Sequence, residues 1–444
     1  MQGELIIVGG GIAGLTTAEL FQRSGWQVTL VERESKLCQG SSGKHHEWFH
    51  LGSLYASFNA DTFLKLIENA FQIVTYYKHM RGMNMRIEDN KFVFTNQPSA
   101  WFRDETFDYF IKNLPYDKRP VTPFFRYLVD LCKWKLKNFR FFSCHNAMHR
   151  DLLDIPLITA LADYLLQTNQ ATKNANLNLQ TNNLPYTPGL DRTMNSTNIT
   201  ADLTYSFLHH GGKIKTNHQL IKFKNKNKRV SVILKHHDEQ IKLDADRLIL
   251  TMGMGLNKVS QAKHVNTVIS PLLVAYPEVH RRNFVIVADK MEDTINHLHH
   301  RVDDKVYSVI GGGYFADPND QNAIKNIKQN LIQRAQQTFI KLKDSHTHIY
   351  LSHKTEILSP HDPSRNYVYQ IKKINKRIFY AVPGKASLAF SLAIDLFKKL
   401  NPNQTPVLAS PYSSTSTKIE NYFERMMHAK VVSALINKKR VVNE

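Results

Sequence analysis

The fold of this 444-residue chain is decided near its start, by Ile6-Ile-Val-Gly-Gly-Gly-Ile-Ala-Gly-Leu-Thr-Thr-Ala-Glu-Leu20. The short apolar run before the glycines is typical of a strand buried on both faces of a parallel sheet. Apolar residues at helical spacing follow the glycines, and Gln27-Val-Thr-Leu-Val31 predicts a second strand that ends at Glu32. These segments together predict a βαβ unit with connections of ordinary length.

The glycine pattern Gly9-x-Gly11-x-x-Gly14 has a physical reason at each position. The first glycine permits a tight turn, the second lets a pyrophosphate approach the backbone, and the third lets helix and strand pack closely. The N-terminus of the helix offers N–H groups and a partial positive charge to the diphosphate. Glu32 can accept hydrogen bonds from both ribose hydroxyls, which a 2′-phosphate would prevent. We therefore predict a dinucleotide site, against the alternative of a glycine turn without a ligand.

Composition limits the class of protein. Hydrophobic residues at 42% and charged residues at 22% lie near the globular averages of about 45–50% and 25%, which argues against overall disorder. The net charge of +20 attracts anions: a phosphorylated substrate, an acidic membrane or nucleic acid. Three cysteines without a close pair exclude a disulfide scaffold and a four-thiolate metal site. With no apolar run of about 18–20 residues and no signal-peptide pattern, we expect a cytoplasmic protein.

The rest of the chain is predicted in coarser terms. The expected elements are helices in 58–166, a long Asn/Thr-rich loop over 167–200, a helix over 201–210, strands at 213–216, 230–234 and 248–251, a hairpin tip at 222–229 and a helix over 386–400. A last amphipathic helix is expected over 419–436, with Ile419, Phe423, Met427, Val431 and Leu435 at steps of four. It either packs on its own domain or a partner protomer, or docks on anionic membrane as a peripheral contact.

Four stretches resemble the D-amino-acid-oxidase-like superfamily of flavoproteins, which includes glycerol-3-phosphate dehydrogenase, glycine and sarcosine oxidases and L-2-hydroxyglutarate dehydrogenase. The first is the opening Ile6 to Leu20, with Leu30-Val-Glu32-Arg33-Glu; the second is Gly40-Ser-Ser-Gly-Lys-His-His-Glu-Trp-Phe-His50-Leu-Gly-Ser-Leu-Tyr55. The third pairs Gly211–Leu220 with Asp246–Gly253, and the fourth is Pro383-Gly384-Lys385-Ala-Ser-Leu-Ala-Phe390. The resemblance implies FAD as the cofactor.

The resemblance also implies a domain organisation. We expect an α/β protein with a Rossmann-type FAD-binding domain that is discontinuous in sequence (1–58, 199–256 and 380–400). A mainly helical insertion (59–198), a second, α+β substrate domain (257–379) and a C-terminal helical tail (401–444) complete the chain. The residues implied to contact FAD are Gly9, Gly11, Ile12, Ala13, Gly14, Glu32, Arg33, Ser41, Ser42, Leu220, Gly253, Gly384 and Lys385.

Catalytic candidates follow from position and chemistry. His50 shares a His-x-Gly-x-x-Tyr spacing with the hydroxyglutarate branch and can take a proton near neutrality. It could instead be a core histidine or only line the flavin. Tyr307 lies on a predicted strand of the substrate domain and could cap the pocket or act there. A helix start near Gly384-Lys385 would stabilise the negative charge of reduced flavin.

Two further uses of histidine and cysteine are weighed. Relatives attach flavin covalently through such residues, so His45, His46 and Cys38 are candidates of lower rank. The pairs His209-His210, His236-His237 and His299-His300 suggest a metal site, but adjacent side chains diverge and chelate poorly. We expect these pairs at the surface and predict no metal.

The sequence therefore favours an FAD-dependent oxidoreductase that takes hydride onto flavin from a small hydroxy acid, amino acid or similar alcohol or amine. Its partners would be a small, anionic substrate and either oxygen or an electron carrier. The alternative is a non-catalytic flavoprotein, or one associated with nucleic acid like the RNA-modifying members of the superfamily. Against nucleic acid, no compact basic and aromatic motif occurs.

Overall fold

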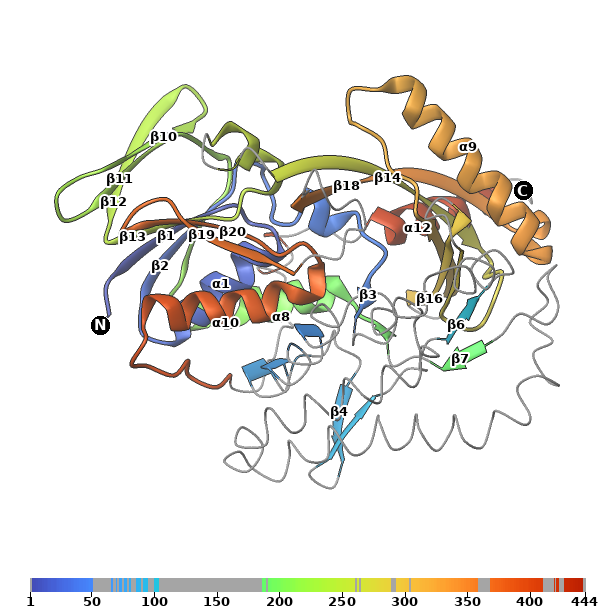
Figure 1. Ribbon diagram of the computed structural model, residues 1–444, viewed down its shortest axis with the longest axis horizontal. Coiled ribbons are helices and arrows are strands. Elements are labelled where there is room, and N and C mark those ends of the chain that lie inside the picture. The colour runs from blue at the N-terminus through green and yellow to red at the C-terminus, as the bar shows by residue number, and fades with distance from the viewer. Residues whose placement is uncertain are drawn as a thin grey trace, which may run out of the picture.

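The computed structural model describes residues 2–50, 191–259, 265–288, 293–302, 305–357, 368–409 and 427–441, with shorter segments between them. The described chain forms an α/β domain, at the left in Figure 1, and a second domain built on another sheet, at the right. The long antiparallel strands β14 (Val265–Tyr276) and β18 (His346–Ile357) extend between the two, β14 running towards the second domain and β18 back towards the first. The predicted fold class, a Rossmann-type domain with a second domain, is confirmed.

The first sheet has the order β19-β20-β13-β1-β2-β9. Its strands are β1 (Glu4–Val8), β2 (Gln27–Val31), β9 (Lys213–Lys215), β13 (Arg247–Leu250), β19 (Gln370–Lys373) and β20 (Ile378–Val382). All neighbours are parallel except β19 and β20. The chain leaves β1 towards β2 and β9 on one side and later towards β13 and β20 on the other. The strand order therefore reverses at β1, which is where open α/β sheets bind ligands.

Strand β1 alternates between two cores because successive side chains point to opposite faces. Leu5 and Ile7 pack towards the helices α1 (Ile12–Arg23), α8 (Ser196–His209) and α10 (Ala389–Leu400). Ile6 and Val8 pack on the other face with residues of a three-stranded sheet, β10 (His218–Asn225), β11 (Val230–His236) and β12 (Glu239–Ala245). Burial on both faces explains the unbroken apolar run of β1.

Two sequence expectations around α8 and β10 were wrong in detail. Helix α8 begins at Ser196, inside the stretch that we expected to be a loop, because the side chain of Asn195 caps it by accepting from the Asn198 N–H at 2.9 Å. The basic run 222–229 is not all hairpin tip, since β10 continues to Asn225 and only the four residues before Val230 turn. Strand β19 also joins the first sheet before the predicted boundary at residue 380.

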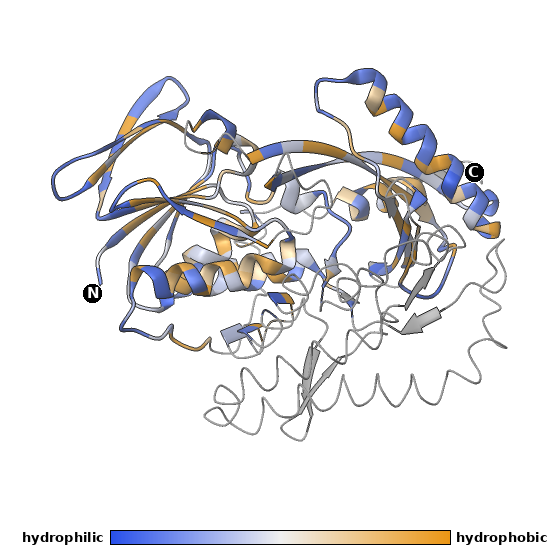
Figure 2. Ribbon diagram, viewed as in Figure 1, coloured by the Kyte–Doolittle hydropathy of each residue, from blue (hydrophilic) through white to orange (hydrophobic). Residues whose placement is uncertain are grey.

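The second sheet has the order β18-β14-β17-β16-β15-β6-β7. Its further strands are β15 (Phe284–Val287), β16 (Ile295–Val302), β17 (Lys305–Gly312), β6 (Ala100–Arg103) and β7 (Tyr186–Pro188). Strand β6 and the hairpin of β4 (Met85–Glu88) and β5 (Lys91–Phe94) come from the stretch predicted to be helical, and β7 comes from the predicted loop over 167–200. Helix α9 (Gln321–Thr338) buries Ile324, Ile327, Leu331 and Ala335 against this domain and keeps a hydrophilic outer face (Figure 2).

The C-terminal helix α12 differs from the prediction. It runs over Met427–Val441, after a turn at residues 421–422, whereas Ile419 packs separately in the core of the first domain. Val432 of α12 is buried, and Met427, Val431 and Ile436 pack beside it on the core around β14 and β17. The expectation that this helix packs on its own chain therefore holds, and membrane contact stays an untested prediction. Phe423 lies outside the described residues.

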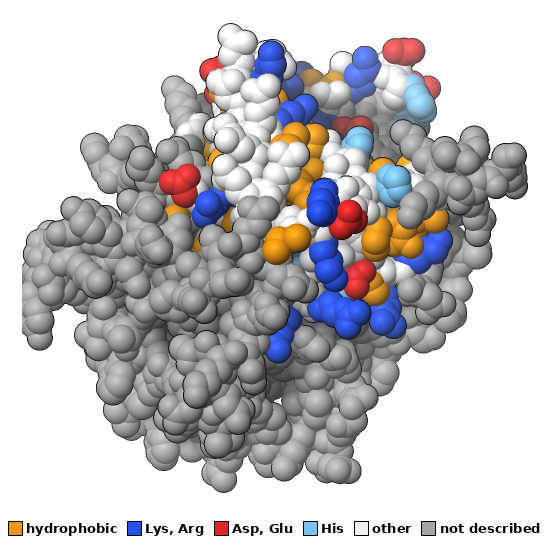
Figure 3. Space-filling model, turned by 90° about the vertical axis from the view of Figure 1, so that its right-hand side faces the viewer, with side chains coloured by type: hydrophobic (Ala, Val, Ile, Leu, Met, Phe, Trp, Pro, Cys, Tyr) orange, Lys and Arg blue, Asp and Glu red, His pale blue; other side chains and the backbone are white. Residues whose placement is uncertain are grey.

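Lysine and arginine side chains are clustered on part of the described surface (Figure 3). On the face seen in Figure 3, lysine and arginine side chains gather in the lower described part with hydrophobic side chains beside them. Among the described residues, no helix combines the length and the apolar character needed to cross a membrane.

The Asn195 cap generates a test of the fold. Asn195→Ala removes the acceptor for the Asn198 N–H, so the free energy of unfolding should fall by about 0.5–2 kcal/mol. Asn195→Asp keeps an acceptor at the same place and should stay near the wild type. Urea unfolding of both variants measures the difference, and an equal loss in the two would rule out the cap.

Candidate active site

The glycines between β1 and α1 are required by close contacts. Gly9 has a φ of +113°, which favours glycine, and a Cβ on Gly14 would lie 1.8 Å from the Gly9 carbonyl oxygen. This contact lets α1 start directly above the end of β1. The helix begins with Gly11 as its N-cap, which has no side chain of its own, and it carries no acidic residue in its first turn. Its partial positive charge is therefore available to an anion.

Ser42 lies over this helix start. Its Oγ accepts from the Ile12 N–H at 2.9 Å, and a Cβ on Gly11 would stand 3.0 Å from the same oxygen. Ser41 and Ser42 belong to a 3₁₀ helix, Ser41–Gly43. The Ser42 hydroxyl, the backbone N–H groups at the start of α1 and Gly11, which has no side chain, thus lie close together. This donor set suits the diphosphate of a dinucleotide, so the predicted residues fit the phosphate part of FAD.

Glu32 ends β2 beside the same turn. Its two oxygens accept from the Gly10 N–H at 2.7 Å and the Glu34 N–H at 2.9 Å. Burial raises the pKa of its carboxyl, while these backbone hydrogen bonds oppose the rise. The carboxylate is held in place, and each oxygen has a second lone pair for a ribose hydroxyl. Arg33, also predicted at this site, pairs with Glu34 at the surface.

The other predicted cofactor residues lie on neighbouring elements. Leu220 is on β10 at an irregularity of the ladder with β11, and it packs on the core shared with β1. Gly253 follows β13 with a φ of +53°, and Gly384 follows β20 with a φ of +66°. Lys385 precedes the 3₁₀ turn Ala386–Leu388, which leads into α10. These positions are compatible with the predicted roles, which remain predictions.

His50 has a carboxylate partner that the sequence did not suggest. Its Nδ1 lies 4.0 Å from Oδ1 of Asp191, and both side chains are largely buried. Burial lowers the pKa of His50 to about 4, although Asp191 opposes the shift. The ring also stacks on Trp48, with 6.0 Å between the centroids. Gly52 and Tyr55, the remainder of the predicted motif, lie outside the described residues.

Two lysines from different elements add positive charge here. Lys385 and Lys354, the latter on β18, both lower the pKa of His50 by their charge, and Lys354 acts in the same way on His45 and His46. Lys354 Nζ also lies 4.8 Å from the centre of the Phe315 ring. A buried neutral imidazole, a carboxylate and two ammonium groups thus occur together. Such a group can take a proton and attract an anion.

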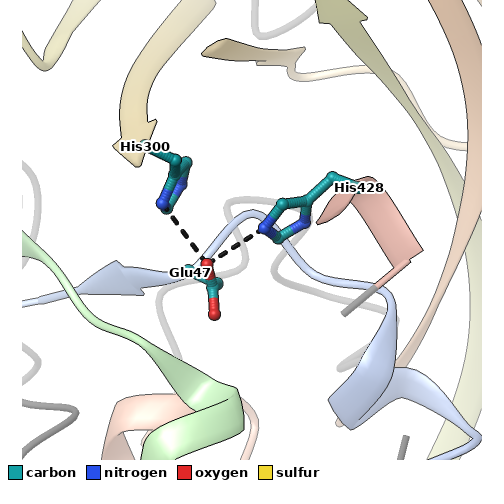
Figure 4. Close-up of side chains that lie close together, drawn as sticks. All are labelled: Glu47, His300 and His428. Atoms are coloured by element: carbon teal, nitrogen blue, oxygen red, sulfur yellow. Dashed lines mark hydrogen bonds and ion pairs between the residues drawn. The ribbon is translucent and has the colours of Figure 1, made fainter. Parts of the chain in front are cut away.

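A second buried group lies next to this one along the chain. The imidazoles of His300 on β16 and His428 on α12 both point at the carboxylate of Glu47 (Figure 4). The histidines lower the pKa of Glu47 to about 2 against its burial, and burial lowers the pKa of His300 to about 4. The expectation that His299-His300 lies at the surface was wrong for His300. Alternation along β16 turns it inward, and it is only 7% exposed.

Tyr307 and the candidates for covalent attachment are placed as follows. Tyr307 is buried, and its ring lies 5.7 Å from that of His300. His45 uses both ring nitrogens, since Nδ1 accepts from the Glu47 N–H and Nε2 lies 3.1 Å from Ser196 Oγ. Cys38 is buried, and burial raises the pKa of its thiol to about 12. These contacts disfavour attachment through His45 or Cys38.

Comparisons with known proteins agree with this geometry. Residues 4–123 match the family described as FAD dependent oxidoreductase. A curated protein, the tRNA 5-methylaminomethyl-2-thiouridine biosynthesis bifunctional protein MnmC of Methylobacillus flagellatus, is 46% identical over 41 residues. That match spans 9% of this chain and 6% of that protein.

Solved structures share the fold at low identity. Glycine oxidase from Geobacillus kaustophilus has a TM-score of 0.57 at 11% identity, with 93% of this chain and 98% of that chain covered. L-alpha-glycerophosphate oxidase from Mycoplasma pneumoniae, solved with FAD bound, has a TM-score of 0.60 at 12% identity, with 91% and 96% covered. L-proline dehydrogenase from P. horikoshii has a TM-score of 0.58 at 12% identity, with 91% and 94% covered.

The helix start generates a test of cofactor binding. Gly11→Val should purify folded but colourless, because the added side chain occupies the space of the pyrophosphate. Gly40→Ala is the matched control, since a Cβ there meets nothing within 4 Å, and it should retain FAD. The absorbance of the purified proteins and the nucleotide released on denaturation measure the difference. Full flavin in Gly11→Val, or FMN in place of FAD in the wild type, would contradict the assignment.

Proposed function

We propose that this chain, which belongs to the D-amino-acid-oxidase-like superfamily of FAD-dependent oxidoreductases, oxidises a small anionic hydroxy acid, amino acid or related alcohol or amine. FAD is its cofactor, and when bound it supplies the acceptor for the hydride of the substrate C–H bond. The observation that carries the proposal is the pairing of buried His50 with Asp191 at 4.0 Å, on the segment that continues from Ser42 over the nucleotide turn.

His50 would hold the proton that the substrate hydroxyl or ammonium gives up. Because burial keeps the imidazole neutral at neutral pH, it is ready to accept. Asp191 lies on the Nδ1 side, which leaves Nε2 as the atom that we assign to take the proton, and the carboxylate would stabilise the imidazolium that forms. Trp48 stacked on the ring would fix its plane. Tyr307 stays a predicted catalytic residue, placed beside His300.

Lys354 and Lys385 support an anionic substrate. Both act on His50 through their charge, so they lie near the group that would receive the proton. Arg301 on β16 is a further cation of the second domain, but its side chain is exposed. A carboxylate or phosphate on the substrate would be attracted by the two ammonium groups, and Lys385 would also stabilise negative charge on the flavin.

A substrate panel tests the proposal. The FAD-bound protein is mixed without oxygen with hydroxy acids, amino acids and glycerol phosphate, and loss of the yellow absorbance reports reduction. Bleaching by a member of the panel is expected. If a substrate bleaches the flavin, oxygen or a carrier dye is added to the reduced protein to identify the electron acceptor. Salt-sensitive retention of RNA without bleaching would instead favour the nucleic-acid alternative.

His50 should matter for the rate and not for cofactor binding. His50→Ala should keep bound FAD and slow flavin reduction by about 10²–10⁴-fold, the usual contribution of an acid–base group. His299→Ala, which changes a neighbour of His300 on the other face of β16, should stay near wild type. Stopped-flow reduction measures both. Equal rates for His50→Ala and wild type would leave His50 as a lining residue. The search for a base would then move to Tyr307 and to Tyr314, another buried tyrosine of the second domain.

The low pKa of His50 predicts the pH dependence of the free enzyme. A histidine base with the ordinary pKa of about 6.5 would lose activity as the pH falls from 8 to 6. With a pKa of about 4, His50 stays neutral over that range, and the His50-dependent part of the rate should fall only as the pH approaches 4. The second-order rate constant for flavin reduction from pH 8 to 4.5 measures this, with His50→Ala as the reference. A midpoint near 6.5 would contradict it.

A further inference from the structure

Glu47, His300 and His428 come from three distant parts of the chain and converge on one point (Figure 4). Oε2 of Glu47 lies 3.3 Å from His300 Nδ1 and 3.0 Å from His428 Nε2. All three ligand atoms lie within 4.8 Å of one another, and all three residues are buried. The cluster is separate from the His50–Asp191 pair to which the proton is assigned.

The partners of the two His300 ring nitrogens indicate where a cation could bind. Its Nε2 lies 3.2 Å from the carbonyl oxygen of His46, which only accepts, so Nε2 carries a hydrogen. In the neutral ring, Nδ1 then has a lone pair directed at a carboxylate oxygen 3.3 Å away. Two acceptors face each other there unless Nδ1 carries a second proton, so the geometry calls for a positive charge, a proton or a metal ion, between Nδ1 and Oε2.

The carboxylate is also held rigidly in an unusual conformation. Glu47 has a φ of +65°, which a non-glycine residue rarely adopts and which tends to occur at functional sites. Its Oε1 accepts from the Ser196 N–H at 2.7 Å, and its own N–H donates to His45 Nδ1 at 2.9 Å. These bonds point Oε2 at the two histidines.

Each ligand group has an outer partner of the kind that orients metal ligands. His300 has the His46 carbonyl, Glu47 has the Ser196 N–H, and His428 Nδ1 lies 3.4 Å from the Tyr350 hydroxyl. Tetrahedral zinc, with bonds of about 2.0–2.2 Å, places its ligand atoms about 3.3 Å apart, close to the two separations seen here. One carboxylate and two imidazoles form a known ligand set for zinc and for non-haem iron.

We propose that Glu47 Oε2, His300 Nδ1 and His428 Nε2 bind one divalent transition-metal ion, with Zn²⁺ as the probe. Nitrogen ligands favour this class over Mg²⁺ and Ca²⁺. The ion would tie α12 and β16 to the segment that carries Glu47 and His50, so its first role is to hold the C-terminal helix against β16 and this segment. The proposal concerns a site other than the one that takes the proton, and it stands whether or not the substrate class is right.

The test uses the full chain with FAD bound and without an affinity tag. The protein is treated with a chelator, given one equivalent of Zn²⁺, passed through a desalting column and analysed for metal and for melting temperature. We expect about one zinc ion per chain and a higher melting temperature than in the chelator-treated protein, because a ligand that binds only the folded state stabilises it. No retained zinc and an unchanged melting temperature would overturn the proposal.

Matched variants locate the ion. His300→Gln and His428→Gln should lose the zinc and the shift in melting temperature, whereas His299→Gln and His236→Gln should keep both. Their FAD content and circular dichroism show whether they fold. Tyr350→Phe removes only the hydroxyl next to His428 and leaves all three ligands in place, so it can be tested even if the ligand variants do not fold. It should weaken zinc binding by about 10–100-fold. Zinc that persists in His300→Gln and His428→Gln, or unchanged affinity in Tyr350→Phe, would overturn the assignment.

Discussion

The contact between β1 and α1 is the constraint on which the rest of this structure depends. A Cβ on Gly14 would stand 1.8 Å from the Gly9 carbonyl oxygen, so only hydrogen at that place lets the helix begin where the strand ends. The open helix start then lies at the point where the strand order of the sheet reverses. This packing places the helix start at the predicted dinucleotide site, where Ser42 and Glu32 from the following segments join it.

The same turn determines the path of the segment that follows β2. The Cys38 N–H donates to the Gly10 carbonyl at 3.0 Å, and Ser42 accepts from Ile12 at 2.9 Å, so the segment is attached to the turn at two points. Beyond these attachments it reaches Glu47 and His50 within a few residues. One short piece of chain therefore carries the serine at the start of α1, the carboxylate of the buried cluster and the imidazole assigned to the proton.

Features whose residues lie close together in the sequence could be predicted, and features that join distant residues could not. The βαβ unit was predicted correctly because its signals, glycine spacing and an apolar run, lie within about thirty residues. The partners of Glu47 and His50 carry no such local signal, since His428 lies 381 positions from Glu47 and Asp191 occurs near an Asn-rich stretch. The doubled-histidine argument failed for a related reason. The side chains of His299 and His300 were correctly predicted to point in different directions. It was not predicted that the side chain of His300 points into the core of the second domain.

The division of charge around His50 is a consequence of burial. His45, His46 and His50 are kept neutral because desolvation penalises their charged forms, so they add little positive potential near neutral pH. Lys354 and Lys385 are only partly buried, and their positive charge acts on the His50 ring. On the function that we propose, attraction of the anionic substrate and acceptance of its proton therefore belong to different groups. Binding of the substrate anion therefore does not compete with proton transfer for one side chain.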